Sequence, residues 1–336
     1  MSAKKRSAGR IVLTVIAALL GVIVLVAAVF VIIPLTETVE NYQGKNSVGW
    51  MAALPDDMPI NEVVLPGTHD SSTQFVHLGF LAKCQALSVR EQLEAGYRYF
   101  DLRMEVAPQE TKMKHGFLDC QVSGWPWSKS LTLDDVFFGQ VREFLTIYES
   151  EFIVFSVKME HGDGSIADLQ HRIRGTLGSE YMLLTDKIPT VGEARGKIVV
   201  MRRYEDEGGR VHAGGIPFIW QDQGNRDNTS LAAESYDQGS YMLTVQDRYK
   251  YDSDDKWKAF TDTLAYAQAA GSAGKPEIVV NFLSTNGNTT YGHPYAYARD
   301  LNERFMKLDS KDLSGWIIVD FGSGRMAEKI WLANFD

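Results

Sequence analysis

The strongest hydrophobic pattern in the chain is an unbroken apolar segment near its N-terminus. Residues 11–33 carry no charge, only Thr14 and Gly21 depart from strongly apolar side chains, and Pro34 follows directly. As an α-helix this segment is about 34 Å long at about 1.5 Å per residue, which is enough to cross the hydrocarbon core of a bilayer, about 30 Å thick. The pattern therefore predicts one transmembrane helix.

Beyond residue 59, short apolar and β-branched runs alternate with stretches of helical periodicity. We expect strands at residues 63–65, 99–102, 112–114, 152–157, 197–201, 242–245, 278–282 and 317–319. Helices are expected at residues 133–148, 256–270 and 295–308. Strands that alternate with helices indicate βα units and a parallel sheet, and eight strands fit an α/β fold of the irregular TIM-type (β/α) barrel. Residues 204–241 are too long and irregular an interval for a regular βα repeat.

Charges on either side of the apolar segment predict its orientation. Four basic residues precede it within the first ten positions, whereas Glu37 and Glu40 follow it. Basic flanks stay on the cytoplasmic side, so everything after residue 36 is expected to cross the membrane. A cleavable signal peptide has a shorter apolar core, of about 7–15 residues, and a small-residue cleavage site. We therefore expect an uncleaved single-pass anchor in the cell membrane with the barrel outside the cell; secretion after signal-peptide cleavage is the alternative.

These patterns divide the chain into four parts. We expect a cytoplasmic basic segment at residues 1–10, a transmembrane signal-anchor at 11–33, a polar stalk at 34–58 and a barrel at 59–336.

The composition of the chain limits the kinds of molecule that it is expected to bind. The chain has 43 Asp and Glu against 34 Lys and Arg, a formal net charge of −9, and four of the basic residues precede the apolar segment. An acidic surface argues against nucleic acid as a partner. The two cysteines, Cys84 and Cys120, could form one disulfide in an exported domain or remain two unrelated buried thiols, and the sequence leaves both open.

Ionisable residues gather at one end of the predicted strands. They stand at or just past the strand ends: His69, Asp70, Asp101, Arg103, His115, Lys158, Arg202, Arg203, Asp247 and Asp320. A single histidine at a strand end is usually structural, but in a TIM-type barrel the carboxyl-terminal face carries the active site. Two histidines can act as base and acid, and an arginine can hold a phosphoryl oxygen between them. This set is suited to cleaving a phosphodiester.

Eight ordered motifs carry a resemblance to a known family. They are LPGTHDSST, FDLR, KHG, FSVKME, GKIVVMRRY, TVQDRYKY, VNFLS and GWIIVDFGS, which run from residue 65 to residue 323. Together they resemble the bacterial phosphatidylinositol-specific phospholipases C, from about residue 50 to the C-terminus. The resemblance implies an irregular TIM barrel and cleavage of phosphatidylinositol to diacylglycerol and inositol 1,2-cyclic phosphate. The resemblance leaves open whether glycosylated phosphatidylinositol is also a substrate. We expect the protein to be a monomer.

The resemblance also implies catalytic roles. His69 resembles the general base that takes the proton of the inositol 2-hydroxyl, and Asp320 resembles the carboxylate that orients its ring. His115 resembles the general acid that protonates the departing diacylglycerol oxygen, with Asp70 as its partner. Arg103 resembles the arginine that binds the phosphoryl oxygens. Asp101 belongs to the same cluster.

Four further positions match residues that hold the inositol ring in the family. These are Lys158, Arg203, Asp247 and Tyr249, the tyrosine by packing against the ring. Arg202 beside Arg203 leaves a one-residue ambiguity. Related calcium-dependent enzymes place metal ligands where this chain has Arg103, so the resemblance implies catalysis without a metal or other cofactor.

Two competing hypotheses remain. One is a metal-dependent, glycerophosphodiesterase-like enzyme, which would need a carboxylate cluster in place of Arg103. The other is a non-catalytic lipid- or glycan-binding barrel, which the presence of both histidines and their carboxylates disfavours. Trp125 and Trp127, on a loop shortly after His115, are either packed core or an apolar wedge for the lipid interface.

Overall fold

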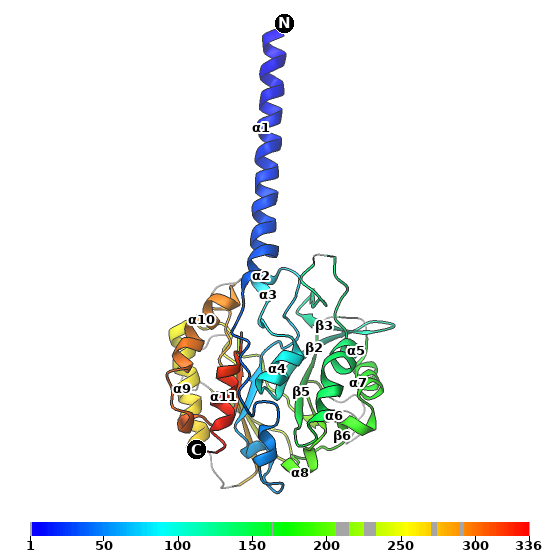
Figure 1. Ribbon diagram of the computed structural model, residues 1–336, viewed down its shortest axis with the longest axis vertical. Helices are drawn as coiled ribbons and strands as arrows, with labels where there is room; N and C mark the ends of the chain where they lie inside the picture. The colour runs from blue at the N-terminus through cyan, green and yellow to red at the C-terminus, as the bar shows by residue number, and fades with distance from the viewer. Residues whose placement is uncertain are drawn as a thin grey trace.

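The computed structural model describes residues 2–125, 127–160, 162, 164–205, 215–224, 233–269, 274–288 and 292–335. A long helix stands out from a barrel that contains the rest of the described chain (Figure 1). This helix consists of α1 (Ser2–Ala27), a π-helical turn η1 (Ala28–Ile32) and α2 (Ile33–Thr36). Its part Gly9–Thr36 has a mean hydropathy of 3.3 in its most apolar window and is long and apolar enough to cross a membrane.

Eight parallel strands follow one another around the barrel in sequence order. Among the described residues, β1 pairs with β2, β2 with β5, β5 with β7, β7 with β8, β10 with β11, β11 with β12, and β12 pairs back with β1. The strands are β1 (Leu65–Thr68), β2 (Tyr99–Val106), β5 (Ile153–Met159), β7 (Ile198–Arg202), β8 (Ile216–Pro217), β10 (Met242–Gln246), β11 (Glu277–Phe282) and β12 (Trp316–Val319).

Side chains next to the strand ends connect β8 with β10. The Tyr241 hydroxyl donates to the carbonyl of Pro217, and the Gln238 side-chain amide exchanges two hydrogen bonds with the backbone of Ile219. The arrangement is the irregular TIM-type barrel expected from the sequence.

Four short strands lie outside this ring. They are β3 (Thr111–His115), β4 (Leu118–Asp119), β6 (Met182–Leu183) and β9 (Glu234–Asp237). The expectation that residues 112–114 form a barrel strand is wrong, because β3 folds back antiparallel on β2. Only four residues connect β2 and β3, which is too short for a crossover between parallel strands. The missing barrel strand is β8, inside the interval that looked irregular in sequence.

Helices cover the outside of the barrel. They are α3 (Gly79–Ala82), α4 (Val89–Ala95), α5 (Leu133–Val136), α6 (Arg142–Ile147), α7 (Ile166–Tyr181), α8 (Val191–Ala194), α9 (Ser253–Ala269), α10 (Pro294–Phe305) and α11 (Gly324–Leu332). A π-helical turn, η4 (Phe137–Val141), interrupts the helix expected at 133–148. Short 3₁₀ turns occupy Trp50–Ala53, Ile60–Glu62 and Ser310–Asp312.

Alternating side chains along the barrel strands face either the surrounding helices or the inside of the barrel. In β2, Phe100 and Leu102 face the helices and belong to the outer core, whereas Tyr99 packs inside the barrel against Phe218 and Trp316. Asp101 and Arg103 share the inner face with Tyr99 because successive strand residues point to opposite sides. The aromatic layer at the level of Tyr99 therefore fills the barrel beneath the polar residues.

The segment expected as a stalk is part of the barrel. Trp50 is 2% exposed, stacks on Trp331 and donates its indole N–H to the Gly96 carbonyl at 3.0 Å. Buried Arg98 donates to the carbonyls of Ser47 and Val48. Residues 34–58 are thus not an extensible stalk, because this polar-looking sequence contains buried residues that close the base of the barrel.

Both cysteines are buried free thiols.

Candidate active site

A cavity of about 240 Å³ opens at the carboxyl ends of the barrel strands. Nine of the ten site residues expected from the sequence line it: His69, Asp70, Arg103, His115, Lys158, Arg203, Asp247, Tyr249 and Asp320. The tenth, Asp101, is fully buried beside Arg103. Parallel strands end at the same edge of the barrel, which is why positions far apart in sequence meet here.

The turn after β1 presents two of these residues. The His69 N–H donates to Val319 of the neighbouring strand at 3.0 Å, which continues the ladder to the end of β1. Asp70 then adopts the left-handed conformation, with φ of 41°. Aspartate tolerates this region better than most residues do, and the turn places both side chains at the cavity.

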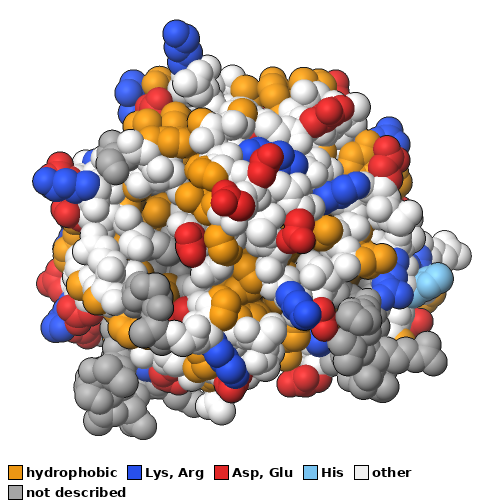
Figure 2. All heavy atoms as spheres, turned by 90° about the horizontal axis from the view of Figure 1, so that it is seen from below, with side chains coloured by type: hydrophobic (Ala, Val, Ile, Leu, Met, Phe, Trp, Pro, Cys, Tyr) orange, Lys and Arg blue, Asp and Glu red, His pale blue; other side chains and the backbone are white. Residues whose placement is uncertain are grey.

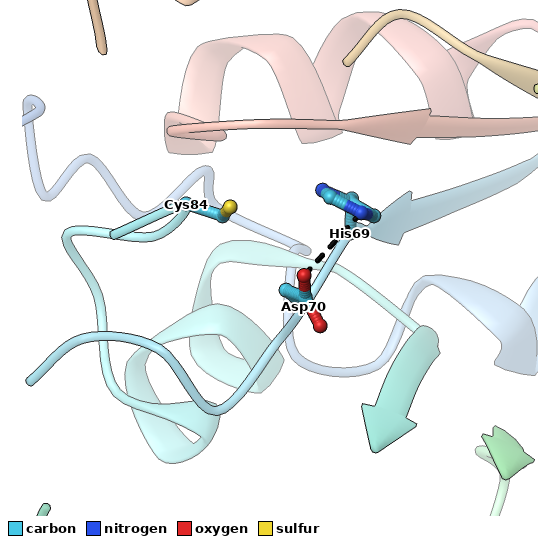
Figure 3. Close-up of side chains that lie close together, drawn as sticks. All are labelled: His69, Asp70 and Cys84. Atoms are coloured by element: carbon cyan, nitrogen blue, oxygen red, sulfur yellow. Dashed lines mark ion pairs between the residues drawn. The ribbon is translucent and has the colours of Figure 1, made fainter. Parts of the chain in front are cut away.

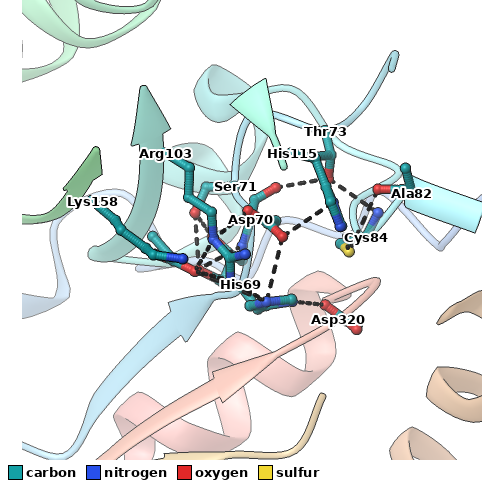
Figure 4. A network of polar contacts seen from close by, with 12 residues as sticks. His69, Asp70, Ser71, Thr73, Ala82, Cys84, Arg103, His115, Lys158 and Asp320 are labelled. Atoms are coloured by element: carbon teal, nitrogen blue, oxygen red, sulfur yellow. Dashed lines mark hydrogen bonds and ion pairs between the residues drawn. The ribbon is translucent and has the colours of Figure 1, made fainter. Parts of the chain in front are cut away.

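His69 is held at both ring nitrogens. Nδ1 lies 2.8 Å from Asp320 Oδ1, and Nε2 lies 2.8 Å from Arg103 Nη2 (Figure 4). A guanidinium can only donate, so this contact fits an unprotonated Nε2 and a proton on Nδ1 toward Asp320. Burial favours the neutral ring, but the charges of Asp320 and Asp70 outweigh it and raise the pKa of His69 to about 9. The residue is a strong base with a fixed orientation.

Arg103 is clamped between two buried carboxylates. Its Nε lies 2.8 Å from Asp70 Oδ1, and its Nη2 lies 3.2 Å from Asp101 Oδ2. Burial opposes its charge, but Asp70 and Asp101 raise its pKa well above the ordinary value. In turn, Arg103 and Arg203 overcome the burial of Asp101 and lower the pKa of that carboxyl. The guanidinium is therefore a fixed positive charge facing the cavity.

His115 lies on the other side of Asp70. Its Nδ1 is 3.1 Å from Asp70 Oδ2, and the ring is partly exposed to the cavity. Burial and the positive charges of Arg103 and His69 lower its pKa despite Asp70. Asp70 thus joins the arginine and the second histidine in one network, with Asp320 serving the first histidine (Figure 4).

A second group of residues forms the wall of the cavity on the side away from His115. Arg203 Nη1 lies 3.1 Å from Asp101 Oδ1, and its guanidinium stacks on Trp220 at 3.8 Å from the ring centroid. Trp220 Nε1 donates to Asp247 Oδ2 at 3.3 Å. Arg202 instead donates to the carbonyls of Gly215 and Tyr204, so of the two arginines it is Arg203 that lines the cavity.

The remaining expected residues complete this wall. The Tyr249 hydroxyl donates to Asp222 Oδ1 at 2.7 Å, and burial followed by this contact raises the pKa of the tyrosine. Lys158 Nζ is 3.0 Å from Glu160 Oε1. The sequence analysis missed Trp220 and Asp222 because they lie in an interval with no clear periodicity.

His69, Asp70 and Cys84 form a group whose ligand-type atoms lie within 4.8 Å of one another (Figure 3). The surroundings do not suit a resident cation. Arg103 already neutralises Asp70, and burial raises the pKa of the Cys84 thiol well above its usual value, which disfavours the thiolate that binds metals.

The fold and site define a class. A TIM-type barrel whose cavity holds an arginine and two histidines around one buried aspartate, with a second carboxylate on the first histidine, is a barrel phosphodiesterase.

Comparisons with known proteins narrow the class. The chain is 28% identical over 299 residues to 1-phosphatidylinositol phosphodiesterase of Staphylococcus aureus strain Newman, covering 82% of this chain and 89% of that one. It is 30% identical over 173 residues to the Listeria monocytogenes protein of the same name, covering 47% of this chain and 50% of that one. No protein-family model matches.

Solved structures agree. That of the F249X mutant of phosphatidylinositol-specific phospholipase C from Staphylococcus aureus matches with a TM-score of 0.68 and 25% identity, over 85% of this chain and 97% of that one. The Listeria monocytogenes enzyme shares the fold, with a TM-score of 0.61 and 22% identity over 86% and 98% of the two chains. The relatives and structural neighbours of this chain are thus bacterial phosphatidylinositol-specific phospholipases C.

Proposed function

We propose that the protein cleaves phosphatidylinositol to diacylglycerol and inositol 1,2-cyclic phosphate, using its own side chains and no metal. One observation carries this proposal. Arg103 is fixed between Asp70 and Asp101 and lies 2.8 Å from His69, while His115 lies on the opposite side of Asp70. A base, a phosphoryl-binding cation and an acid thus surround the buried carboxylate of Asp70.

The first half of the reaction forms a ring. The inositol 2-hydroxyl gives its proton to His69 Nε2, and its oxygen attacks the adjacent phosphorus. The attack closes a five-membered ring, so holding the headgroup in place supplies effective molarity. Arg103, which contacts Nε2 in the free site, turns its N–H groups toward the non-bridging oxygens and stabilises the charge that develops there.

The second half expels the lipid. The bond between phosphorus and the glycerol oxygen breaks, and that oxygen takes a proton from Nε2 of His115, whose Nδ1 faces Asp70. The anionic substrate raises the proton affinity of His115 as it binds beside it. Asp320 keeps the proton on His69 Nδ1 and stabilises the imidazolium that forms.

The wall of Arg203, Asp247, Tyr249 and Lys158 suits a ring that carries many hydroxyls. Arg203 and Lys158 are donors, Asp247 is an acceptor, and Tyr249 offers an aromatic face. Arg203 is held by both Asp101 and Trp220, so the inositol site is fixed to the catalytic cluster through Asp101.

We also propose that residues 11–33 stay attached as a single-pass anchor, with the barrel outside the cell. Support comes from the packing of the residues that follow the apolar segment. Glu37 is 3% exposed, and buried Lys83 donates to the carbonyls of Pro34 and Glu37. Cleavage by a signal peptidase just before Glu37 would remove the Pro34 carbonyl that Lys83 binds and leave a new chain end at the buried Glu37.

The specificity can be tested with a panel of phospholipids that differ only in headgroup. The purified protein should release diacylglycerol from phosphatidylinositol and not from phosphatidylcholine or phosphatidylethanolamine, which lack a hydroxyl next to the phosphate. Equal release from all three would refute the proposed mechanism.

A further inference from the structure

The end of the membrane helix is built into the barrel. We call residues 30–37 the helix base. Phe30 meets Phe80 of α3 edge-on at 6.1 Å between centroids, and Phe80 stacks on His293 at 4.0 Å. His293 Nε2 in turn lies 2.5 Å from Glu37 Oε1. The contacts form a closed loop from the helix to the barrel and back to the helix base.

A buried lysine fixes the same junction. Lys83 Nζ donates to the carbonyls of Pro34 at 2.6 Å and Glu37 at 2.8 Å. The last carbonyls of a helix have no partner within the helix, and a cation there is also favoured by the helix dipole. Lys83 is 5% exposed, so the junction is covered from water. The helix base is therefore anchored on the barrel and is not a free hinge.

The segments that hold the helix base also form the rim of the catalytic cavity. Leu81, Cys84 and Pro294 line that cavity, whereas their neighbours Phe80, Lys83 and His293 contact the helix base. One layer of chain thus separates the helix from the active site. Because the strands end on this side, the cavity opens toward the end of the molecule from which the helix rises (Figure 1).

Exposed aromatic side chains lie at the same end. Gly124 sits against the helix base so closely that a β-carbon there would lie 2.4 Å from Leu35 Cδ2. The adjacent Trp125 and Trp127 are 64% and 81% exposed. On the face opposite the helix, charged side chains of both signs are spread widely (Figure 2). The aromatic loop is thus placed next to the membrane-spanning segment and the charged face points away from it.

We propose that the helix base holds the cavity mouth against the outer leaflet of the membrane that the helix spans, so that the substrate is lipid of that same leaflet. This inference rests on the proposed function and anchoring. A barrel on an extended stalk could turn to any nearby membrane. A barrel docked at the helix base cannot turn to another membrane, because the bilayer that its helix spans covers the mouth of the cavity.

Reconstitution of the full chain into vesicles tests this inference. The protein-bearing vesicles and a second, protein-free population both contain phosphatidylinositol, with different acyl labels. The wild-type protein should cleave its own lipid and leave that of the second population largely intact. Comparable cleavage of both populations would overturn the inference. If neither is cleaved, even when the vesicles are dissolved in detergent, the proposed function itself has failed.

A flexible insertion provides the matched variant. Twelve Gly and Ser residues between Thr36 and Glu37 add a flexible reach of roughly 20 Å and leave the contacts of Glu37 with the barrel possible. The insertion is combined with Phe30→Ala and Leu35→Ala, which release the contacts that residues ahead of the insertion make with the barrel. The ratio of other-vesicle to own-vesicle cleavage should rise about tenfold, since the mouth is no longer held to one surface. The same twelve residues added ahead of Lys4, on the other side of the helix, should leave the ratio unchanged. An unchanged ratio in the Thr36–Glu37 variant, with normal cleavage of soluble glycerophosphoinositol, would contradict the docked orientation.

Discussion

At the scale of single residues, Asp70 connects the parts of the catalytic cluster. Its two oxygens face Arg103 at 2.8 Å and His115 at 3.1 Å, and the second oxygen is 3.4 Å from His69. The carboxylate is 1% exposed, so its contacts with these partners are shielded from bulk solvent. In such a network the residues act as a unit, and the loss of one disables the others.

The histidine variants test that unit. His69→Ala and His115→Ala should each reduce turnover on phosphatidylinositol by about 10³-fold or more, and the double variant should be little worse than either. A substrate with a better leaving group needs less help from an acid and should rescue His115→Ala far more than His69→Ala. Steady-state kinetics on both substrates give the comparison, and near-normal turnover in His115→Ala would remove the general-acid assignment.

The proton shared by the two histidines sets the pH dependence. The reactive state needs His69 unprotonated and His115 protonated, so it holds one proton on the pair. The value of kcat/KM should therefore rise as pH passes the lower pKa of the pair, which is the lowered pKa of His115, and fall above the raised pKa of His69, about 9. Asp320→Asn removes the charge that most strongly raises the pKa of His69. The alkaline limb should therefore move to lower pH, while the acid limb moves less. An alkaline limb that stays in place would mean that His69 is not the group that titrates there.

At the scale of elements, periodicity located most of the barrel but not its irregular parts. The strands β1, β2, β5, β7, β10, β11 and β12 were all anticipated, with ends displaced by up to a few residues. The two-residue strand β8 is too short to show a hydrophobic period. The sequence of β3 resembles that of a barrel strand, because composition alone does not show whether a strand pairs antiparallel with its predecessor or follows it in parallel. Helices α4 and α7 begin at capping boxes, Ser88 with Glu91 and Ser165 with Asp168, a signal that the sequence does contain.

The site itself was more predictable than the segment before the barrel. Strand ends converge in any parallel barrel, so motifs at those ends had to meet. The burial of residues 37–58 depends instead on partners far along the chain, such as Trp331 for Trp50 and Arg98 for Ser47. Local sequence carries no sign of those distant contacts.

Trp50 tests whether residues 37–58 belong to the fold. Trp50→Ala removes a stacked, fully packed indole and its hydrogen bond to Gly96, so the free energy of unfolding of the barrel should fall by about 3–5 kcal/mol. Urea unfolding of the wild-type and variant proteins measures the change. Trp127→Ala, at an 81% exposed position, is the matched control and should change stability by less than about 0.5 kcal/mol. Equal small effects of both substitutions would show that the segment is a stalk after all.

The loop of Trp125 and Trp127 allows a separate prediction about the interface. Replacing both by serine should reduce cleavage of phosphatidylinositol in vesicles severalfold, because exposed indoles partition into the headgroup region. Cleavage of soluble glycerophosphoinositol should not change. Ile147→Ser, which replaces an exposed apolar residue on α6, is the control expected to affect neither substrate. Equal losses on both substrates would point to damage of the site rather than to loss of a membrane contact.

At the scale of the whole molecule, the acidic composition and the position of the helix both bear on how the barrel contacts the membrane. A net charge of −9 gives little attraction to anionic lipid surfaces, so in the proposed arrangement the helix and the loop of Trp125 and Trp127 supply the membrane contact. In the same proposal, Arg103 and Arg203 in the cavity provide the positive charge for the phosphate and the inositol ring.

The central claim is that this cavity forms a cyclic phosphodiester without a metal. Phosphorus NMR of the purified full chain with phosphatidylinositol in detergent, in the presence of a chelator of divalent cations, tests it most directly. The signal of inositol 1,2-cyclic phosphate should appear first, at an undiminished rate, because Arg103 supplies the charge that a cation would supply. Loss of turnover in the chelator with recovery on addition of calcium, or direct appearance of the open monoester, would contradict the account.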